Sequence, residues 1–400
     1  MKNKFRMEEL MRKVFIFVIC LFSFFLSGHV RALELPEEAN LYLSVKWLKE
    51  EIKKQPQKNI VFSPLSLYIS TALLAEGATG ETRQELEKFL QQETVNYLPN
   101  FSTDLSLKGL PFHSDAQVQF ANSLWGNVKP EFISALQDYG NVEIKELPKN
   151  TKEINDWIAQ KTNQKLKKVL TEKKVNPLDV YLVNAVYFKG EWLWPFNERD
   201  TIETDFYSFN KTVKAHMMNR SDSIDYFENE TMQAVRLPYR TSEDGNGDKE
   251  HSMYIFLPQK EVKWADFISN LTANDFYLDF LTNVSVDLFL PRFKFDYQPE
   301  NLKETLEEMG LKRTLKAVGL EKIFPGDSDE SVEVAHKATI SVDENGTEAV
   351  AAQIFYDKNG GLMRGGMETQ KVKFVFNANR PFIFMIDRGL FVGVVSDPSQ

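Results

Sequence analysis

Histidine and cysteine, which carry much of the nucleophilic and metal chemistry of proteins, are scarce in this chain. Cys20 is the one cysteine. The histidines are His29, His113, His216, His251 and His336. The sequence holds no G-x-S-x-G turn, no phosphate-binding loop and no H-E-x-x-H zinc pattern. A triad assembled from distant residues stays open, because geometry and not sequence position defines it. We therefore expect a protein that is not an enzyme and uses no cofactor or metal.

His336 lies in the segment VEVAHKATI, which has the alternation of a strand. Val334 and Ala338 fall on the same side of this strand as the imidazole. Buried polar groups in proteins normally have hydrogen-bond partners. The pattern therefore favours a structural core histidine over a catalytic one.

A long segment between two predicted strands has unusual composition. Residues 346–367 read GTEAVAAQIFYDKNGGLMRGGM, with small residues first and four glycines near the end. Loops of this length without secondary structure are usually functional or disordered. A tolerated surface insertion is the alternative. Thr347, Ala349 and Ala351 argue against it, because they alternate like the small inward face of a strand.

Hydrophobic periodicity predicts helices in the first half of the chain and strands in the second, which is typical of an α+β fold. We expect helices at 41–52, 65–76, 82–90, 154–170 and 302–309. The helix at 82–90 is expected to open with a capping box formed by Thr82 and Glu85. We expect strands at 59–62, 180–188, 253–257, 284–290, 332–342, 372–376, 382–386 and 390–395. The run at 180–188 is apolar throughout, as in a central strand buried on both faces.

Residues 1–32 have the pattern of a secretory signal peptide. A basic start precedes the apolar run 14–26, and small residues follow it. An uncleaved anchor is the alternative, but thirteen residues fall short of the roughly 20 that a spanning helix needs. Cys20 lies inside this segment, so the mature chain is expected to have no disulfide. We expect a secreted, extracellular protein.

Glycosylation sequons agree with this location. They occur at Asn100, Asn210, Asn219, Asn229, Asn270, Asn283 and Asn345. A net charge of −9 does not indicate a nucleic-acid partner. After the first segment, no apolar run is long enough to span a membrane. The lysine-rich run 161–174 could bind a heparin-like polyanion, but it has no interleaved aromatic residues and is more typical of a solvated helix face.

Several motifs, in this order along the chain, resemble those of the serpin family of serine protease inhibitors. They are NIVFSPLS at 59–66, GATGET at 77–82, NAVYFKG at 184–190 with Trp192 and Phe196, LPRFK at 290–294, HKA at 336–338, ENGTEA at 344–349 and NRPFIF at 379–384. One such match would be weak evidence, whereas the ordered set covers nearly all of the mature chain.

The resemblance implies one domain over residues 33–400, with three β-sheets, about nine helices and an exposed reactive-centre loop at about 344–370. It also implies a monomeric suicide inhibitor: a serine protease cleaves the loop and is acylated, and the loop then inserts into the main sheet as a strand. A non-inhibitory serpin, a carrier or storage protein, is the alternative. Bulky or charged inward residues in the hinge would favour it, and Thr347, Ala349 and Ala351 are permissive.

The resemblance also assigns site residues. The hinge, where insertion begins, would comprise Glu344, Gly346, Thr347, Glu348, Ala349, Ala351 and Ala352. The shutter, a polar cluster beneath the opening strands, would comprise Ser63, Ser66, Asn184 and His336. The breach, at the top of the sheet, would contain Trp192 and Arg292, with Arg292 at an ion-pair position for Glu344. Gln353 departs from the pattern, since a polar side chain that faces inward needs a partner.

The expected reactive bond is Arg364-Gly365, which makes a trypsin-like enzyme the expected target. Trypsin-like pockets bind a cation through a carboxylate, and Gly365 lets the backbone extend. Counting from the two ends of the loop brackets this bond, because the loop is longer than usual for the family. The alternatives are Lys358, Gly360 and Met363, and an apolar residue such as Leu362 or Met363 would instead indicate chymotrypsin-like or elastase-like targets.

Overall fold

The computed structural model describes residues 37–91, 117–135, 142–240, 251–277, 281–325, 331–347 and 373–400. The expected signal peptide, Asn100 and residues 348–372 of the reactive loop lie outside these ranges. Among the described helices, none is both long and apolar enough to cross a membrane.

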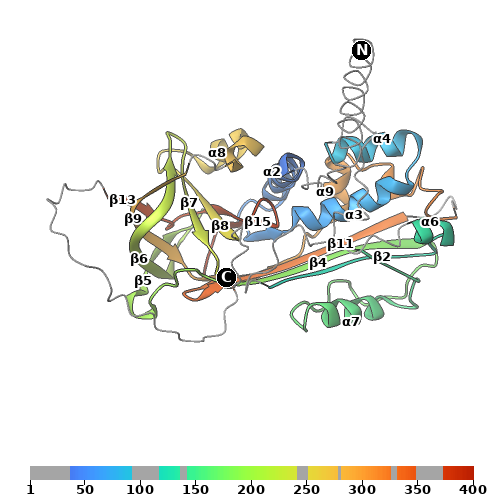
Figure 1. Ribbon diagram of the computed structural model, residues 1–400, viewed down its shortest axis with the longest axis horizontal. Coiled ribbons are helices and arrows are strands. Elements are labelled where there is room, and N and C mark those ends of the chain that lie inside the picture. The colour runs from blue at the N-terminus through green and yellow to red at the C-terminus, as the bar shows by residue number, and fades with distance from the viewer. Residues whose placement is uncertain are drawn as a thin grey trace, which may run out of the picture. The chain divides into compact units, whose positions relative to one another are not determined.

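The described residues form an α+β fold, as predicted from the order of the elements (Figure 1). The α-helices are α2 (Glu37–Lys54), α3 (Pro64–Gly77), α4 (Gly80–Phe89), α6 (Pro130–Ala135), α7 (Thr151–Lys161), α8 (Trp264–Asn270) and α9 (Leu302–Glu308). Short 3-10 helices add η1 (Glu198–Asp200), η2 (Ala273–Phe276) and η3 (Thr314–Lys316).

The strands belong to two hydrogen-bonded sheets. The six-stranded sheet has, in order, β10 (Phe293–Tyr297), β11 (Ser331–Asp343), β12 (Gly346–Thr347), β4 (Asp179–Glu191), β2 (Gln117–Trp125) and β3 (Glu143–Lys145). The nine-stranded sheet has β1 (Ile60–Phe62), β15 (Phe391–Val395), β14 (Phe382–Ile386), β8 (Ser252–Pro258), β7 (Met232–Pro238), β6 (Thr212–Glu228), β9 (Thr282–Pro291) and β13 (Phe374–Asn377), with β5 (Ile202–Tyr207) beside β6.

The expected counts of three sheets and about nine helices are not confirmed for the described part of the chain. Seven α-helices and two sheets are present there. The long strand β6 explains the sheet count. Its residues 212–217 pair with β5, while residues 225–228 pair with β7, so one strand joins what would otherwise be two separate sheets.

Strand β4 of the six-stranded sheet is buried on both faces, as its apolar run predicted. Figure 1 shows α3 on one side of β2, β4 and β11, and α7 on the other. Leu182 and Val186 of β4 belong to the core cluster that contains α3, whereas Tyr181, Val183 and Ala185 pack against α7. Almost every residue of α3 is buried, which is expected for a helix that is apolar all round.

Two expectations about helix ends are wrong. Thr82 does not open a capping box, because α4 begins at Gly80 with Thr79 as its N-cap. The Thr82 hydroxyl instead donates to the carbonyl of Val318, and Glu85 accepts bonds from residues 313 and 314. The helix expected to reach residue 170 is α7, which ends at Lys161. Most of the lysine-rich run is therefore an exposed connection and not a helix face.

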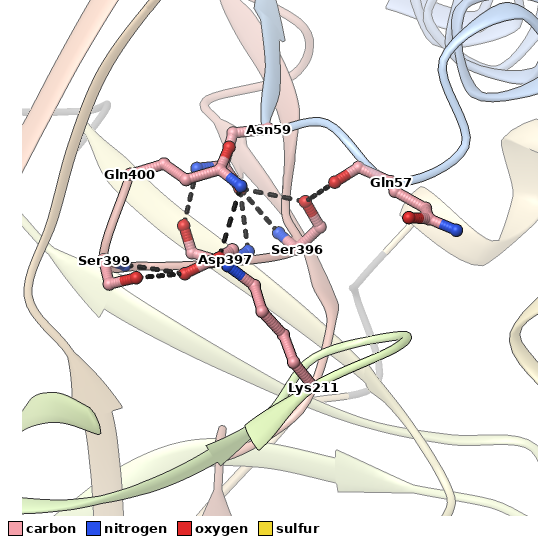
Figure 2. Close-up of polar contacts among 7 residues, drawn as sticks. All are labelled: Gln57, Asn59, Lys211, Ser396, Asp397, Ser399 and Gln400. Carbon is pink, nitrogen blue, oxygen red and sulfur yellow. Dashed lines mark hydrogen bonds and ion pairs between the residues drawn. The ribbon is translucent and has the colours of Figure 1, made fainter. Parts of the chain in front are cut away.

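Asn59 fastens the C-terminal residues to the start of β1 (Figure 2). Its Oδ1 accepts from the backbone N–H of Ser396 at 2.8 Å and of Asp397 at 3.0 Å, and its Nδ2 donates to the carbonyl of Asp397 at 2.7 Å. The side chain thus extends the β1–β15 ladder past Ile60. Burial would raise the pKa of Asp397, but the ammonium of Lys211, 2.7 Å away, and bonds from Ser399 outweigh burial and lower it.

Replacing Asn59 with alanine should lower the free energy of unfolding by a few kcal/mol. It leaves buried backbone groups of Ser396 and Asp397 unpaired, and each such group typically costs about 1–3 kcal/mol. Urea unfolding measures the change. The matched control is Gln57→Ala, because only the backbone carbonyl of the exposed Gln57 takes part in the cluster. Equal stability of the two variants would contradict this role for Asn59.

Candidate functional site

The candidate site is the junction between β4 and β11, at the centre of the six-stranded sheet. The two strands run parallel and pair directly from Ser331 opposite Asp179 to Ala338 opposite Val186. Beyond this point the short strand β12 lies between them and pairs antiparallel with both. The junction is therefore closed along most of its length and already parted at one end.

The geometry of β12 explains the glycine at its start. A Cβ on Gly346 would lie 2.1 Å from the carbonyl oxygen of Gly190, so no other residue fits between the strands here. The turn into β12 is held by Asp343, whose Oδ1 accepts from the N–H of Asn345 at 2.9 Å and of Gly346 at 3.3 Å. Burial raises the pKa of this carboxyl.

Thr347, the second residue of β12, is held by Tyr239. Its side chain is 1% exposed, and its hydroxyl lies 2.7 Å from the Tyr239 hydroxyl. Burial raises the pKa of Tyr239 well above its ordinary value, so the phenol stays neutral and able to donate. Tyr239 stacks on Trp192 with ring centroids 4.7 Å apart, and the Trp192 indole donates to the carbonyl of Asp343 at 2.9 Å.

An ion pair fixes the first residue of this turn. Glu344 is buried, and its Oε1 accepts from Nε of Arg292 at 2.6 Å and from the Thr201 hydroxyl. The structure therefore brings the expected breach residues Trp192 and Arg292 together with the first part of the hinge.

The four expected shutter residues also lie together in the structure. The backbone N–H of Ser63 donates to Nε2 of His336 at 3.1 Å. Asn184 does not bond His336; it lies opposite it in the β4–β11 register and accepts from Ser70 and, at 3.5 Å, from Ser66. The Ser63 hydroxyl caps α3 by accepting from the N–H of Ser66 at 3.2 Å.

Sequence reasoning missed two members of this cluster, Ser70 and Asn122. Ser70 follows Ser66 by one helical turn, a spacing that could have indicated the same face. Asn122 lies opposite Asn184 in the β2–β4 register and accepts from the Ser66 hydroxyl at 2.6 Å. Because β2 was not predicted, no sequence signal placed Asn122 here.

Three buried donors of the cluster lack a hydrogen-bond partner among the described residues. They are Nδ2 of Asn122, Nδ2 of Asn184 and Nδ1 of His336. Because Nε2 of His336 accepts from Ser63, the neutral ring carries its proton on Nδ1. Complete burial lowers the pKa of His336 to about 3, so the imidazole is neutral at physiological pH.

Most of the described sequons are open to solvent. Asn210, Asn229, Asn270 and Asn283 are exposed, and Asn219 and Asn345 are half-buried. Asn219 also donates its side-chain amide to the carbonyl of Asp200. The remaining hinge residues Glu348, Ala349, Ala351 and Ala352, the bond Arg364-Gly365 and its alternatives Lys358, Gly360 and Met363 lie outside the described residues.

His336 should make stability depend on pH. The unfolded imidazole binds a proton below about pH 6.5, whereas the buried ring does not until about pH 3. Stability is therefore lost as pH falls from 6.5 towards 3, by at most about 1.4 kcal/mol per pH unit from this group. We expect the difference in unfolding free energy between the wild-type protein and His336→Gln to shrink from pH 7 to pH 4 in urea titrations. A constant difference would contradict burial of a neutral imidazole.

Comparisons with known proteins agree with this architecture. A family model described as serpin (serine protease inhibitor) matches residues 38–398. An uncharacterized serpin-like protein from Thermococcus kodakarensis is 32% identical over 363 residues, covering 86% of this chain and 81% of the relative. Antitrypsin from Bombyx mori is 28% identical over 394 residues, covering 92% of this chain and 96% of the relative.

Solved structures match over similar lengths. The thermophilic serpin tengpin in its native state superimposes with a TM-score of 0.75 at 27% identity, covering 89% of this chain and 94% of tengpin. Maspin superimposes with a TM-score of 0.76 at 24% identity, covering 90% of this chain and 98% of maspin. With a family model that spans almost every described residue, the chain belongs to the serpin family.

Proposed function

We propose that this chain is a secreted suicide-substrate inhibitor of a trypsin-like serine protease. The observation that carries the proposal is the state of the β4–β11 junction. Eight residue pairs hold it closed, while β12 already enters it as an antiparallel strand at one end. A loop that begins inside the sheet can extend its strand by parting β4 from β11.

Extending β12 would be favourable for two reasons. Each added residue can bond to strands on both sides, and a net backbone hydrogen bond contributes about 0.5–1.5 kcal/mol. The added strand would also pair antiparallel with both neighbours, which is slightly more stable per residue than the parallel pairing it replaces. Cleavage of the loop would release its far end and allow this extension.

The register of β12 suggests a partner for Gln353, the polar residue that departs from the family pattern. Thr347 pairs with Val342 of β11 and Gly190 of β4. If the same antiparallel register continues, residue 353 comes opposite His336 and Asn184. The side-chain carbonyl of Gln353 could then accept from the unpaired nitrogens at this level of the sheet.

The proposed mechanism follows from these contacts. A protease attacks the loop with its serine and becomes acylated by the newly freed end. Insertion then carries the bound enzyme along the sheet before water can release it, and strain stored in the uninserted state drives the movement. The leader-like first 32 residues and the exposed sequons support secretion and glycosylation, and we propose a monomer in solution.

The experiment that tests this function mixes the purified protein with trypsin and looks for a covalent complex that survives boiling in SDS. We expect such a complex, together with a sharp rise in melting temperature after the loop is cut. Thr347→Arg should increase the stoichiometry of inhibition several-fold, since it places a charge in a buried position where insertion begins. Thr347→Ser keeps a hydroxyl for Tyr239 and is the matched control, with stoichiometry close to wild type.

Two outcomes would count against the proposal. A panel of trypsin-like enzymes that gives only cleaved protein and free enzyme, with no rise in melting temperature, would favour a non-inhibitory carrier or storage serpin. Unchanged stoichiometry in Thr347→Arg would mean that the hinge does not begin at this residue.

The reactive bond is proposed to be Arg364-Gly365, and paired substitutions test it. Arg364→Ala should reduce the rate of trypsin inhibition by a factor of 100 or more, because the specificity pocket loses its charge-assisted bonds. Lys358→Ala should have little effect. Sequencing the fragment released from each complex identifies the bond. Full inhibition by Arg364→Ala, with cleavage elsewhere, would discard this bond and leave the family assignment intact.

A further inference from the structure

Helix α2 contains a buried carboxylate, Glu51, which is not among the residues that the family pattern assigns. Glu51 of α2 is 2% exposed. Its Oε1 accepts from Nε1 of Trp47 at 3.1 Å and from the hydroxyl of Thr305 at 3.2 Å, and its Oε2 accepts from the Tyr297 hydroxyl. These donors come from α2, α9 and β10, so one side chain links three elements.

The chemistry of these partners fixes the direction of the bonds. An indole N–H can only donate, so the Oε1 atom must accept from Trp47. No lysine, arginine or histidine among the described residues lies within 4 Å of the Glu51 carboxylate. A buried carboxylate bonded only to neutral donors is costly unless every bond is well placed. Glu51 is therefore expected to hold its partners in defined positions.

Trp47 connects Glu51 with the shutter. Its ring stacks on Phe62 with centroids 4.1 Å apart and packs edge-to-face with the imidazole of His336, with centroids 5.0 Å apart. Phe62 directly precedes Ser63, whose N–H donates to His336. The orientation of the Trp47 ring therefore affects the position of His336 and, through Phe62, the position of Ser63.

Tyr297 connects Glu51 with β11, the strand that carries His336, through the neighbouring strand β10. It lies on β10 opposite Ala338 of β11, two residues from His336. Burial and the nearby Glu51 carboxylate raise the pKa of Tyr297, so its hydroxyl remains a donor. The Glu51 carboxylate is thus bonded to Trp47, which packs against His336 of β11, and to Tyr297 on the neighbouring strand β10.

We infer that Glu51 is a positioning residue for the shutter, which acts through Trp47 and Tyr297 to hold β11 against β4. Its loss would let the two strands part more readily without altering the hinge or the reactive loop. The consequence for inhibition rests on the proposed function, whereas the effect on the closed junction does not.

Four variants test this inference in the full-length protein. Glu51→Leu removes every acceptor, and Glu51→Gln keeps a carbonyl for Trp47 and Thr305. Trp47→Phe keeps an aromatic ring but removes the N–H, and Glu51→Leu/Trp47→Phe combines the two. The matched control is Glu87→Leu. Glu87 is also a buried carboxylate bonded by a side chain one turn away, Arg83, but it lies on α4.

Hydrogen exchange of the backbone amides in residues 182–186 and 334–338 measures how often the junction opens. Glu51→Leu should raise these exchange rates at least tenfold over Glu87→Leu when both are compared at equal distance below their melting temperatures. Glu51→Gln should stay within about threefold of wild type. The double variant should exceed Glu51→Leu only slightly, because the two substitutions break the same link.

A second measurement follows strand insertion itself. The probe is a synthetic peptide with the sequence of residues 346–357, and its uptake is followed by the rise in melting temperature. Faster uptake by Glu51→Leu than by Glu87→Leu supports the inference. Equal exchange and uptake in these two variants, or full additivity in the double variant, overturns it. A wild-type protein that takes up no peptide and gains no stability on cleavage would defeat the proposed function, while hydrogen exchange would still decide the role of Glu51.

Discussion

The direct parallel pairing of β4 with β11 is the interaction on which the rest of this structure depends. It exists only because the reactive loop is not between these strands, and β12 shows where the loop would enter. Helix α3 and strand β1 support the junction from one face, and α7 with the connection after it covers the other. The core therefore surrounds a seam that is closed but incompletely bonded.

The unpaired groups at the β4–β11 junction lower the stability of the closed sheet. Three buried donors at the shutter lack partners among the described residues, and an unpaired buried group typically costs about 1–3 kcal/mol. An uncleaved loop cannot supply acceptors along the whole seam, because both of its ends are anchored, in β12 and β13. If the loop inserts as proposed, these groups would gain partners from the added strand. Under the mechanism proposed above, the closed state would then be less stable than a state with the loop inserted.

The sequence predicts those parts of the fold whose signal is local. The apolar run 180–188 identified β4, and the apolar helix at 65–76 identified α3 within two residues of its ends. The role of Thr82 could not be read locally, since its partner, Val318, is more than 200 residues away. The end of α7 was missed because Asn163 and Gln164 adopt left-handed backbone angles without a glycine or proline to mark the place.

The candidate site likewise has one part that the sequence predicted and another that it could not predict. Motif resemblance placed Ser63, Ser66, Asn184 and His336 in one cluster, but their partners depend on strand register, which no local pattern encodes. Asn122 enters the cluster because β2 and β4 align it with Asn184. The burial of Glu51 could not be predicted from the sequence either, because a glutamate on an amphipathic helix normally faces water.

The two ends of the β4–β11 seam differ, and under the proposed mechanism this difference would give insertion a direction. At the β12 end, Gly346 permits an approach to β4 that any side chain would block, and the Glu344–Arg292 pair and Trp192 hold the turn ready. At the other end, the strands pair fully, and Lys303 reaches from α9 to Glu333 of β11 at 3.1 Å. Opening that begins at the β12 end separates one residue pair at a time and can form two antiparallel contacts in its place. Opening at the other end would break pairs before any new strand could arrive. The shutter lies between these ends, at the level where His336 is opposite Asn184. Under the proposed mechanism, an advancing strand would have to separate these two residues, so the packing of Trp47 and Glu51 would act at that step.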